Sequence, residues 1–576
     1  MKKHTESKNS KRIKVAAIQT SEPESATPEA RRSFLKAGIG LAAGASLVAA
    51  AGASAAVAEA PVQGGPVKWD QTVDVVVCGA GNGGMSAALA AATGGAKTLV
   101  LEISIQVGGN TLMSGGVLHT AGQRTWEDYN KFSFGMHDQV LGKVFVETFW
   151  NEYIPWLQSQ NAYISRPTPE TIGYWGDWML GHGEPGQLRH KMYFDSLMKG
   201  FTAAGGKTML QTRVVKLFTD TEGRVIGVRV KTWKDSPKEE NQRFINIRAR
   251  KTIMAIGGWL MDGEKKQKYL GGPVGDFAEH MCGPFSSGEG IEICQAVGAG
   301  MSKHGWSTFS GNVACATATP LLAGSMEGML KLWREKKPEE WSADYSRGRL
   351  TVPSGWLGTF PQLGNPSRAI LVNHEGKRFI DESSPVLARY PRHTHAIARQ
   401  SHGFAWLIAD KKIYDATPGA EARIKQIIDE GGILGTNGNV IIASSLTEFA
   451  DALARASVAK GAFLRTIAEY NKAVDENKQE ELEVSHFTGN NSGGYAIRTP
   501  PLYAIPVRSD PYFLFGGIRM DQDGRALDPQ GAPISNLYVP PPLGGSGQSD
   551  IYMGGIGCAG TFGFRAGRHA ARSLKA

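Results

Sequence analysis

Apolar runs alternate with small-residue segments from residue 73 onward. Val73–Cys78 is almost wholly apolar, as expected of a strand buried in a parallel sheet. The glycine-rich turn Gly79–Gly84 follows, and small residues then predict a helix over Gly83–Ala92. A second apolar run, Thr98–Leu101, predicts the next strand and ends at Glu102. The pattern therefore predicts a strand, a glycine turn, a helix and a parallel strand.

The glycines of this turn stand where a dinucleotide needs them. Gly79 permits the tight turn, Gly81 lets the backbone approach a pyrophosphate, and Gly84 lets helix and strand pack closely. The helix N-terminus offers N–H groups to the phosphates. Glu102 follows about 20 residues later, where a carboxylate accepts bonds from ribose hydroxyls. We expect dinucleotide binding; the alternative is a plain turn between strand and helix.

Two more glycine clusters follow, at 108–111 and 114–116, and they indicate backbone pressed against a ligand. Helices are expected at Lys143–Gln158 and Leu188–Ala203. Between them, Trp175 lies in an aromatic, turn-rich stretch that either lines a pocket or caps a core.

The pattern changes near residue 356 and returns near residue 514. Thr208–Thr232 reads as a strand pair, and Ile245–Ile256 as two short strands. The segment 356–513 carries amphipathic helices, one beginning at the capping box Ser445–Glu448 and one over Phe463–Asp475. After Gly516-Gly517 the first pattern resumes and ends in a helix predicted over Thr561–Leu574.

These patterns predict an α/β fold, a Rossmann-like domain with an inserted α+β domain. The first part of the Rossmann-like domain spans 70–355, the inserted capping domain 356–513, and the second part 514–576. Residues 1–60 are assigned to a targeting segment.

Charge and cysteine content exclude some classes of protein. The chain has 576 residues and a formal charge of +9, of which +4 belongs to residues 1–60, so the remainder is only mildly basic. No basic stripe with interleaved aromatic residues occurs, so a nucleic-acid partner is not expected. The five cysteines form no CxxC pair, which argues against a haem attachment site or a zinc ribbon. We expect them to be buried, small apolar residues.

The N-terminal segment resembles a twin-arginine export signal. Arg31-Arg32-Ser33-Phe34-Leu35-Lys36 precedes a weakly apolar Ala/Gly-rich run at 37–56, with cleavage-type small residues between about 53 and 60. The alternative is a retained membrane anchor. Twin-arginine export carries folded proteins, so we expect a protein exported with its cofactor in place, to the periplasm or the outer face of the cytoplasmic membrane.

From residue 73 to the end, the chain resembles the flavoprotein superfamily of fumarate reductases, urocanate reductases and 3-ketosteroid dehydrogenases. The matching pieces include GAGNGG at 79–84, GGNTLMSGG at 108–116, AILVNHEGKRFIDE at 369–382 and GGIRMDQDGRALDPQGAPISNLYV at 516–539. The resemblance implies FAD as the cofactor. It also implies that the closing helix points its N-terminus at the flavin ring, where the positive dipole favours the anionic reduced flavin.

The cofactor-binding residues expected from the motifs and the resemblance come from the glycine turns, the acidic position and the start of the closing helix. They are Gly79, Gly81, Gly83, Gly84, Glu102, Gly108, Gly109, Asn110, Thr111, Ser114, Gly115, Gly116, Val215, Ala255, Gly257, Gly258, Glu289, Gly554, Gly555 and Ile556.

Departures from the family pattern bear on the substrate. Phe360 and Phe513 stand where family fumarate reductases have histidines, and the HGxNR signature is absent before the last helix. The Glu-x-x-Arg relay of those enzymes is not seen either. A buried dicarboxylate would lack its charge partners, which is costly. We therefore do not expect fumarate as the substrate, and assign Phe360, Phe513 and Trp175 to the substrate pocket.

The expected acid–base groups are Tyr390, with Arg389 beside it, and Tyr552. A phenol serves as acid or base when a neighbouring cation or a helix N-terminus lowers its pKa. The alternative for either tyrosine is a wall residue. His393, His395 and His402 have no acidic partner at metal-ligand spacing, so no metal site is expected.

The sequence thus predicts an exported FAD-dependent oxidoreductase acting on CH–CH groups. Hydride passes between flavin N5 and the conjugated C=C bond of an apolar or aromatic enone-like substrate, and we expect reduction fed by a separate electron-donor protein or quinone. The alternatives are a 3-ketosteroid-type dehydrogenase working oxidatively, a fumarate-type dicarboxylate reductase, and a non-catalytic flavin electron carrier.

Overall fold

The computed structural model of the chain describes residues 67–114, 116–166, 178–182, 187–233, 242–260, 262–270, 286–302, 308–314, 368–382, 396–416, 440–486, 488, 494–548 and 552–575. All of them belong to one compact unit, residues 56–576. None of the helices described there has both the length and the apolar content of a membrane span.

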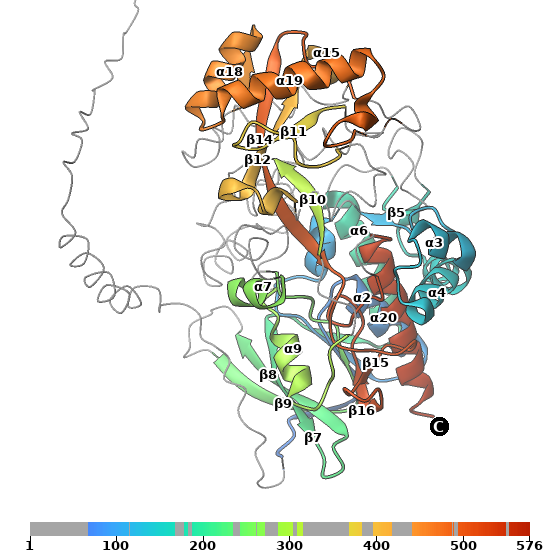
Figure 1. Ribbon diagram of the computed structural model, residues 1–576. Helices are drawn as coiled ribbons and strands as arrows, with labels where there is room; N and C mark the ends of the chain where they lie inside the picture. Colours follow the sequence, from blue (N-terminus) through green and yellow to red (C-terminus); the bar gives the residue numbers. More distant parts are fainter. Residues whose placement is uncertain are drawn as a thin grey trace, which may run out of the picture. The chain divides into compact units, whose positions relative to one another are not determined.

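A sheet of eight strands carries the N-terminal and C-terminal parts of the described chain (Figure 1). Its main path runs β15 (Arg525–Leu527), β16 (Pro533–Tyr538), β9 (Gln242–Met254), β1 (Gln71–Cys78), β2 (Thr98–Leu101) and β6 (Lys207–Met209). β1 pairs in parallel with both β2 and β9. Buried on both faces, β1 needs the continuous apolar run that its sequence supplies. The predicted α/β fold is confirmed.

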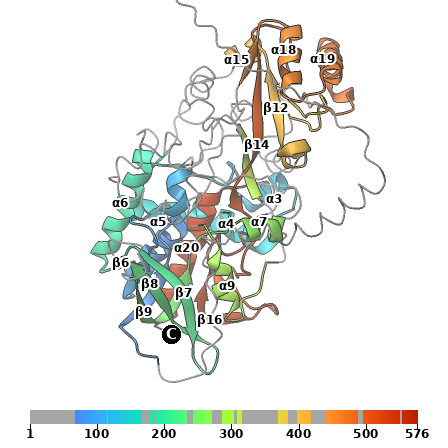
Figure 2. The same cartoon turned by 90° about the vertical axis from the view of Figure 1, so that its left-hand side faces the viewer.

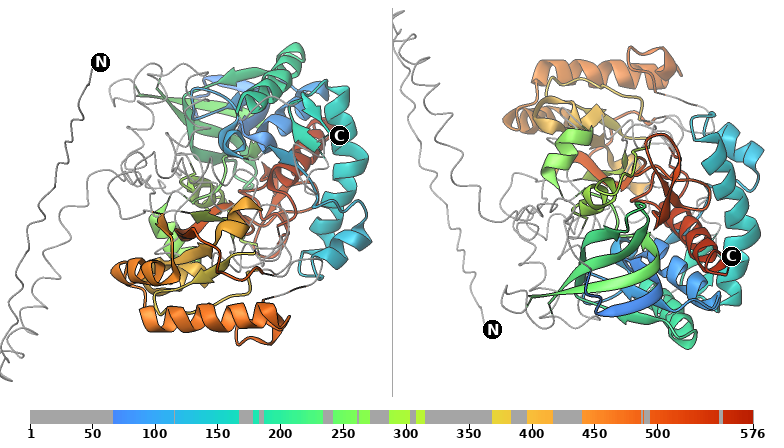
Figure 3. Two further views of the ribbon diagram at one scale, coloured as in Figure 1. Left: turned by 90° about the horizontal axis from the view of Figure 1, so that it is seen from above. Right: turned by 90° about the horizontal axis from the view of Figure 1, so that it is seen from below.

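Two antiparallel strands extend this sheet. β7 (Thr212–Thr219) pairs with β8 (Val225–Trp233), and β8 pairs with the first half of β9, so the three form a ribbon (Figure 3). The expectation of two short strands at 245–256 is wrong, because β9 is one 13-residue strand. Its first half pairs with β8 and its second half with β1, so pairing continues along its whole length.

The helices α2 (Asn82–Thr93) and α20 (Gly555–Arg572) lie side by side against the sheet (Figures 1 and 2). Their backbones approach closely because small residues face one another. A Cβ added at Gly563 would overlap the Gly83 carbonyl oxygen, and one at Gly567 would overlap the Ala87 carbonyl oxygen. α20 begins six residues before the predicted start, because this packing outweighs the poor helix propensity of the glycines at 555–563.

Other helices and a small sheet surround this core. α4 (Gln139–Thr148), a π-helical segment (Phe149–Tyr153) and α5 (Ile154–Ser159) follow one another directly, close to the predicted helix, and α6 spans Gln187–Ala203. The remaining elements of this part are η2 (Gly109–Met113), β3 (Val117–Leu118), α3 (Trp126–Phe132), β4 (Ile164–Ser165), β5 (Trp178–Leu180), α7 (Gly263–Leu270) and α9 (Glu289–Gln295).

A second sheet has five strands and its own core. The strands are β10 (Thr308–Ala314), β14 (Leu502–Leu514), β12 (Phe404–Ala409), β11 (Ile370–Val372) and β13 (Ile441–Ala443). The helices are α15 (Lys411–Asp415), α18 (Leu446–Arg455) and α19 (Lys460–Asp475), with a 3-10 turn at Gln479–Glu481. α18 packs on β13 and β14 and also on α19 (Figure 2).

The predicted capping box begins α18. Ser445 accepts a hydrogen bond from the Glu448 N–H (3.2 Å), and the Glu448 carboxylate accepts one from the Ser444 N–H (2.9 Å). Phe449 and Leu453 then point into the second core, where they meet Phe463 of α19. The amphipathic pattern of both helices is thus satisfied by burial.

The division into domains stays a prediction. The boundary expected at 355/356 falls outside the described residues, and β14 crosses the one expected at 513/514 without interruption. β10, which precedes residue 356, pairs with β14 from Thr308↔Leu514 to Ala314↔Val507. Cys78, Cys294 and Cys558 are buried and free, as expected, while Cys282 and Cys315 lie outside the described residues.

Candidate functional site

The first glycine turn forms a cradle at the N-terminus of α2. Gly79 has φ +98°, and a Cβ there would overlap the Ala255 carbonyl oxygen. A Cβ at Gly84 would overlap the Gly79 carbonyl oxygen. A Cβ at Gly81, in contrast, would meet nothing nearer than the Gly108 oxygen at 3.9 Å. Gly81 is the N-cap and supplies no side chain, so space and the helix dipole remain for an anion.

Glu102 closes the other side of this turn. Its carboxylate is buried and accepts hydrogen bonds from the Ala80 N–H (2.7 Å) and the Ser104 N–H (2.8 Å). Burial raises the pKa of Glu102 despite these bonds. Two N–H donors leave further lone pairs on the carboxylate, as ribose hydroxyls require.

The second glycine cluster is fastened to the first. The Gly108 N–H donates to the Ala80 oxygen (2.9 Å), and the Asn82 N–H donates to Thr111 Oγ1 (3.4 Å). Gly108 and Gly109 have φ of +130° and +49°, so the turn between them depends on glycine. The two clusters therefore form one continuous wall around the N-terminus of α2.

The neighbouring side chains of this loop are also held. Asn110 Nδ2 donates to Ser286 Oγ (3.0 Å), and Ser114 Oγ donates to the Thr111 oxygen (2.6 Å) and accepts from the Gly116 N–H (3.1 Å). Gly116, at φ +74°, packs near His190. Gly115 lies outside the described residues.

Asn82 joins the two helices of the cradle. Its Nδ2 donates to the Ile556 carbonyl oxygen of α20 (2.9 Å) and to Tyr153 Oη (3.2 Å). Its Oδ1 accepts from Tyr193 Oη (2.7 Å). Asn82 is 2% exposed, and Gly83 packs on α20 beside it. One buried amide thus links the predicted pyrophosphate end of the site to the predicted flavin end.

The remaining predicted cofactor residues lie on the strands and loops beside the cradle. The Ala255 N–H donates to the Cys78 oxygen (2.7 Å), Gly257 has φ +88°, and Gly258 packs on Leu514. Val215 is half-buried in β7. Glu289, at the start of α9, forms an ion pair with Arg213, so in this structure its carboxylate is directed at a protein side chain.

An aromatic cluster stands at the N-terminus of α20. Tyr552 Oη accepts a hydrogen bond from the Gly555 N–H (2.7 Å). The Tyr552 ring meets Phe513 edge to face at 5.5 Å and His119 at 5.5 Å. The Gly555 N–H lowers the pKa of Tyr552, but burial raises it more, so the expected net lowering by the helix N-terminus is wrong. Tyr552 is therefore a neutral phenol, a proton donor rather than a base.

Several predicted residues lie outside the described residues. They are Phe360, Trp175, Arg389, Tyr390, His393 and His395, and the side chain of His402 is likewise not described. Phe513 and Tyr552 are brought together; their relation to Tyr390 stays a prediction.

Sequence reasoning missed three groups at this site: His119, the tyrosines that hold Asn82, and the glycine stripe of α20. The stripe could have been found, because Gly560, Gly563 and Gly567 recur at helical spacing. Tyr153 and Tyr193 are indistinguishable in sequence from ordinary core aromatics. His119 follows the SGG turn by only three residues, and that proximity was the available signal.

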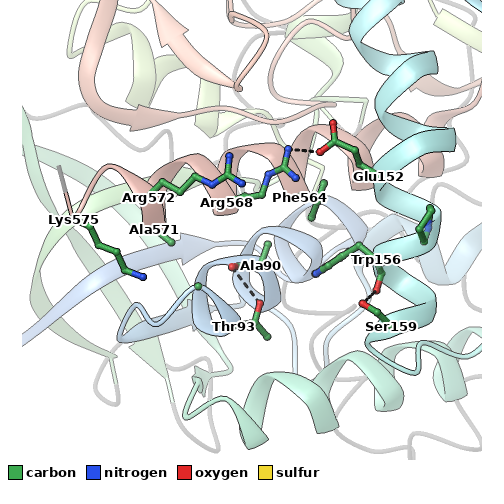
Figure 4. A pocket seen from close by; sticks show the side chains of 12 residues that line it. Ala90, Thr93, Glu152, Trp156, Ser159, Phe564, Arg568, Ala571, Arg572 and Lys575 are labelled. Atoms are coloured by element: carbon green, nitrogen blue, oxygen red, sulfur yellow. Dashed lines mark hydrogen bonds and ion pairs between the residues drawn. The ribbon is translucent and has the colours of Figure 1, made fainter.

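A separate cleft of about 650 Å³ lies along the C-terminal half of α20 (Figure 4). Arg568 stands over the Phe564 ring at 4.6 Å and pairs with Glu152 at 2.5 Å. Arg568 is 13 residues from Gly555, about 20 Å along the helix. This cleft is therefore remote from the aromatic cluster and is not the expected reaction site.

Comparison with known proteins gives the same picture. A family model described as "FAD binding domain" matches residues 74–309 and 351–539. A probable fumarate reductase of Shewanella frigidimarina is 24% identical over 518 residues, covering 87% of this chain and 75% of that protein. A vinyl phenol reductase of Lactiplantibacillus plantarum is 23% identical over 547 residues, covering 87% and 96%.

Solved structures share the fold. The 3-ketosteroid Δ1-dehydrogenase of Sterolibacterium denitrificans, in complex with 1,4-androstadiene-3,17-dione, superposes with a TM-score of 0.62 at 18% identity. The match covers 87% of this chain and all of that one.

Proposed function

The chain belongs to the FAD binding domain family, and from this premise we propose that it reduces the conjugated C=C bond of a neutral, apolar or aromatic enone. It is an FAD-dependent oxidoreductase, and its curated relatives include C=C reductases and a 3-oxosteroid dehydrogenase. The substrate class and the direction of reaction are the parts proposed.

The residues fit FAD. Gly81 leaves open space at the N-terminus of α2, where the pyrophosphate binds, and Glu102 presents a buried carboxylate for the adenosine ribose. Gly554 begins α20 without a side-chain cap, so the first N–H groups of that helix face the flavin end. Bound FAD supplies a hydride, which carries two electrons to the substrate.

The single observation that carries the substrate class is the Phe513–Tyr552 pair at the start of α20. These side chains offer aromatic surface and one neutral phenol where the family's fumarate reductases hold carboxylates with cations. An uncompensated dicarboxylate would pay its desolvation without an ion pair. A neutral enone has no such cost and gains from the aromatic walls.

Tyr552 supports the reductive direction. Reduction of C=C needs one hydride and one proton, and a neutral phenol has a proton to give. Burial holds the pKa of Tyr552 above its ordinary value, so the phenol stays protonated at neutral pH. In the oxidative direction the same group would first have to be a phenolate, which burial disfavours.

The test is an anaerobic assay of the purified, FAD-loaded chain with reduced viologen as electron donor. We expect 4-phenylbut-3-en-2-one to reoxidise the dye and fumarate to leave it reduced. Reoxidation by fumarate alone overturns the substrate class. Faster turnover of 4-phenylbutan-2-one with an artificial oxidant overturns the direction.

We further propose that the chain is exported by the twin-arginine route and receives electrons from a separate protein or quinone. The proposal rests on Arg31-Arg32 within RRSFLK and on the small residues near 53–60. Replacing both arginines with lysine is expected to retain the chain in the cytoplasm, as cell fractionation would measure. Unchanged export of the double variant contradicts the route.

A further inference from the structure

His119 is built into the start of α20 by its backbone. It directly follows β3 (Val117–Leu118). A Cβ at Gly554 would overlap the His119 carbonyl oxygen, and a Cβ at Gly557 would lie 3.1 Å from it. Both positions are glycine, so the main chain of His119 rests directly on the first turn of the helix. Its ring is thereby fixed beside the candidate reaction site.

The protonation state of the ring is also fixed. His119 Nδ1 accepts a hydrogen bond from the Ala121 N–H (3.1 Å), so in a neutral ring the proton is on Nε2. The side chain is 2% exposed, and burial lowers the pKa of His119 to about 4. Above about pH 5 the ring is therefore a neutral N–H donor rather than a cation.

The ring shares its surroundings with Tyr552. The two rings meet edge to face at 5.5 Å and 61°, and Phe513 stands against Tyr552 at 5.5 Å and 72°. The Gly555 N–H holds Tyr552 Oη from the helix side. The cluster thus contains two neutral polar hydrogens, those of Tyr552 and of His119 Nε2, among aromatic faces.

We propose that His119 Nε2–H hydrogen-bonds the carbonyl oxygen of the substrate and selects a neutral carbonyl over a carboxylate. This rests on the proposed function. As hydride adds to the β carbon, negative charge builds on the carbonyl oxygen, and the donor stabilises it. A proton then joins the α carbon and gives the saturated ketone. An external two-electron donor, reduced viologen in the assay, makes good the electrons.

The substrate pair 4-phenylbut-3-en-2-one and cinnamate tests the inference. Both carry a phenyl ring on a C=C bond, and they differ in presenting a methyl ketone or a carboxylate. We expect His119→Phe, which keeps the aromatic contact with Tyr552, to lower kcat/KM for the ketone by about 10²-fold. His119→Gln, which keeps an N–H donor, is expected to restore part of this loss.

The ratio of the two rates is independent of how much variant enzyme is active, so partial misfolding does not obscure the result. A second readout is the binding of the unreactive ketone 4-phenylbutan-2-one, followed by the flavin absorption spectrum. His119→Phe is expected to weaken this binding by about 10-fold, the loss of one hydrogen bond. The matched control is His569→Gln, at the far end of α20, where His569 Nδ1 bonds Tyr538 Oη (2.9 Å).

Two failures are distinguishable. If the unaltered enzyme reduces no enone, the proposed function fails. If it reduces the ketone but His119→Phe keeps both the ketone-to-cinnamate ratio and the affinity for 4-phenylbutan-2-one, the inference about His119 is overturned.

Discussion

Asn82 is the residue on which the two ends of the cofactor site depend. Its amide makes three buried hydrogen bonds, to Tyr153, Tyr193 and the Ile556 carbonyl. Asn82→Ala leaves those groups without this partner, at about 1–3 kcal/mol for each group left unsatisfied. We expect a lower melting temperature and faster release of FAD, measured by thermal unfolding and by the rise of free-flavin fluorescence.

The control for Asn82→Ala is Gln158→Ala, an exposed position on α5. Surface substitutions of this kind change stability by about 0.5 kcal/mol or less. If Asn82→Ala released FAD at the rate of the Gln158→Ala control, the bridge between the helices would carry no weight in cofactor binding.

At this scale, the sequence predicts the residues whose backbone does the chemistry better than those whose side chains do. Gly79 and Gly84 were identifiable because only glycine fits their close approaches. Glu102 was identifiable by its spacing from the turn. His119 and Tyr193 were not, because their partners are more than 70 residues away or reached only through the fold.

The packing of α20 on α2 is the element-scale feature that aligns the site. Gly567→Ala would push a methyl group into the Ala87 carbonyl, which is rigid backbone. Overpacking of this kind costs about 1–3 kcal/mol. We expect destabilisation in that range in urea unfolding, together with weaker FAD binding.

Gly461→Ala in α19 is the matched control. It is also a glycine inside a helix, but its Cβ would meet only the Arg465 side chain at 3.7 Å. Alanine there should stabilise the helix by about 0.5–1 kcal/mol. Equal effects of the two substitutions would mean that helix propensity, not the contact with α2, governs α20.

Element boundaries show where local patterns fail. The periodicity located α19 to within three residues of its start, because α19 stands on one apolar face. It placed the start of α20 six residues late, because a glycine-rich segment is helical there only through tertiary packing.

A buried ion pair governs how the second core responds to acid. Arg378 pairs with Glu382 (2.5 Å), and His486 Nδ1 lies 3.4 Å from the same carboxylate. Burial alone would raise the pKa of Glu382, but the charge of Arg378 and the bonds from His486 and Arg378 outweigh it and lower the pKa to about 2.

The folded pKa of Glu382 lies below the unfolded value of about 4.3, so its stabilisation is complete above that pH and is lost as the pH falls towards about 2. We therefore expect amides of β11 and β12 to lose protection from hydrogen exchange over this window. Glu382→Gln should remove the dependence and destabilise the fold at all pH values, since Arg378 loses its partner. Protection that stays constant down to about pH 2 contradicts the assignment.

On the scale of the whole molecule, the family and its cofactor follow from motifs spread in order along the chain, and the family match confirms both. The substrate does not follow from those motifs. It depends on a few positions, Phe513 and Tyr552 among them, whose meeting requires β14 and the start of α20 to come together.

The most direct measurement of the central claim is the reoxidation of the reduced enzyme in a single turnover. The FAD-loaded chain is reduced anaerobically, mixed with 4-phenylbut-3-en-2-one or with fumarate, and followed by the visible absorbance of oxidised flavin. The account predicts that the ketone restores this absorbance, with one saturated ketone formed per flavin, and that fumarate does not. Rapid reoxidation by fumarate, with the ketone inert, would contradict it.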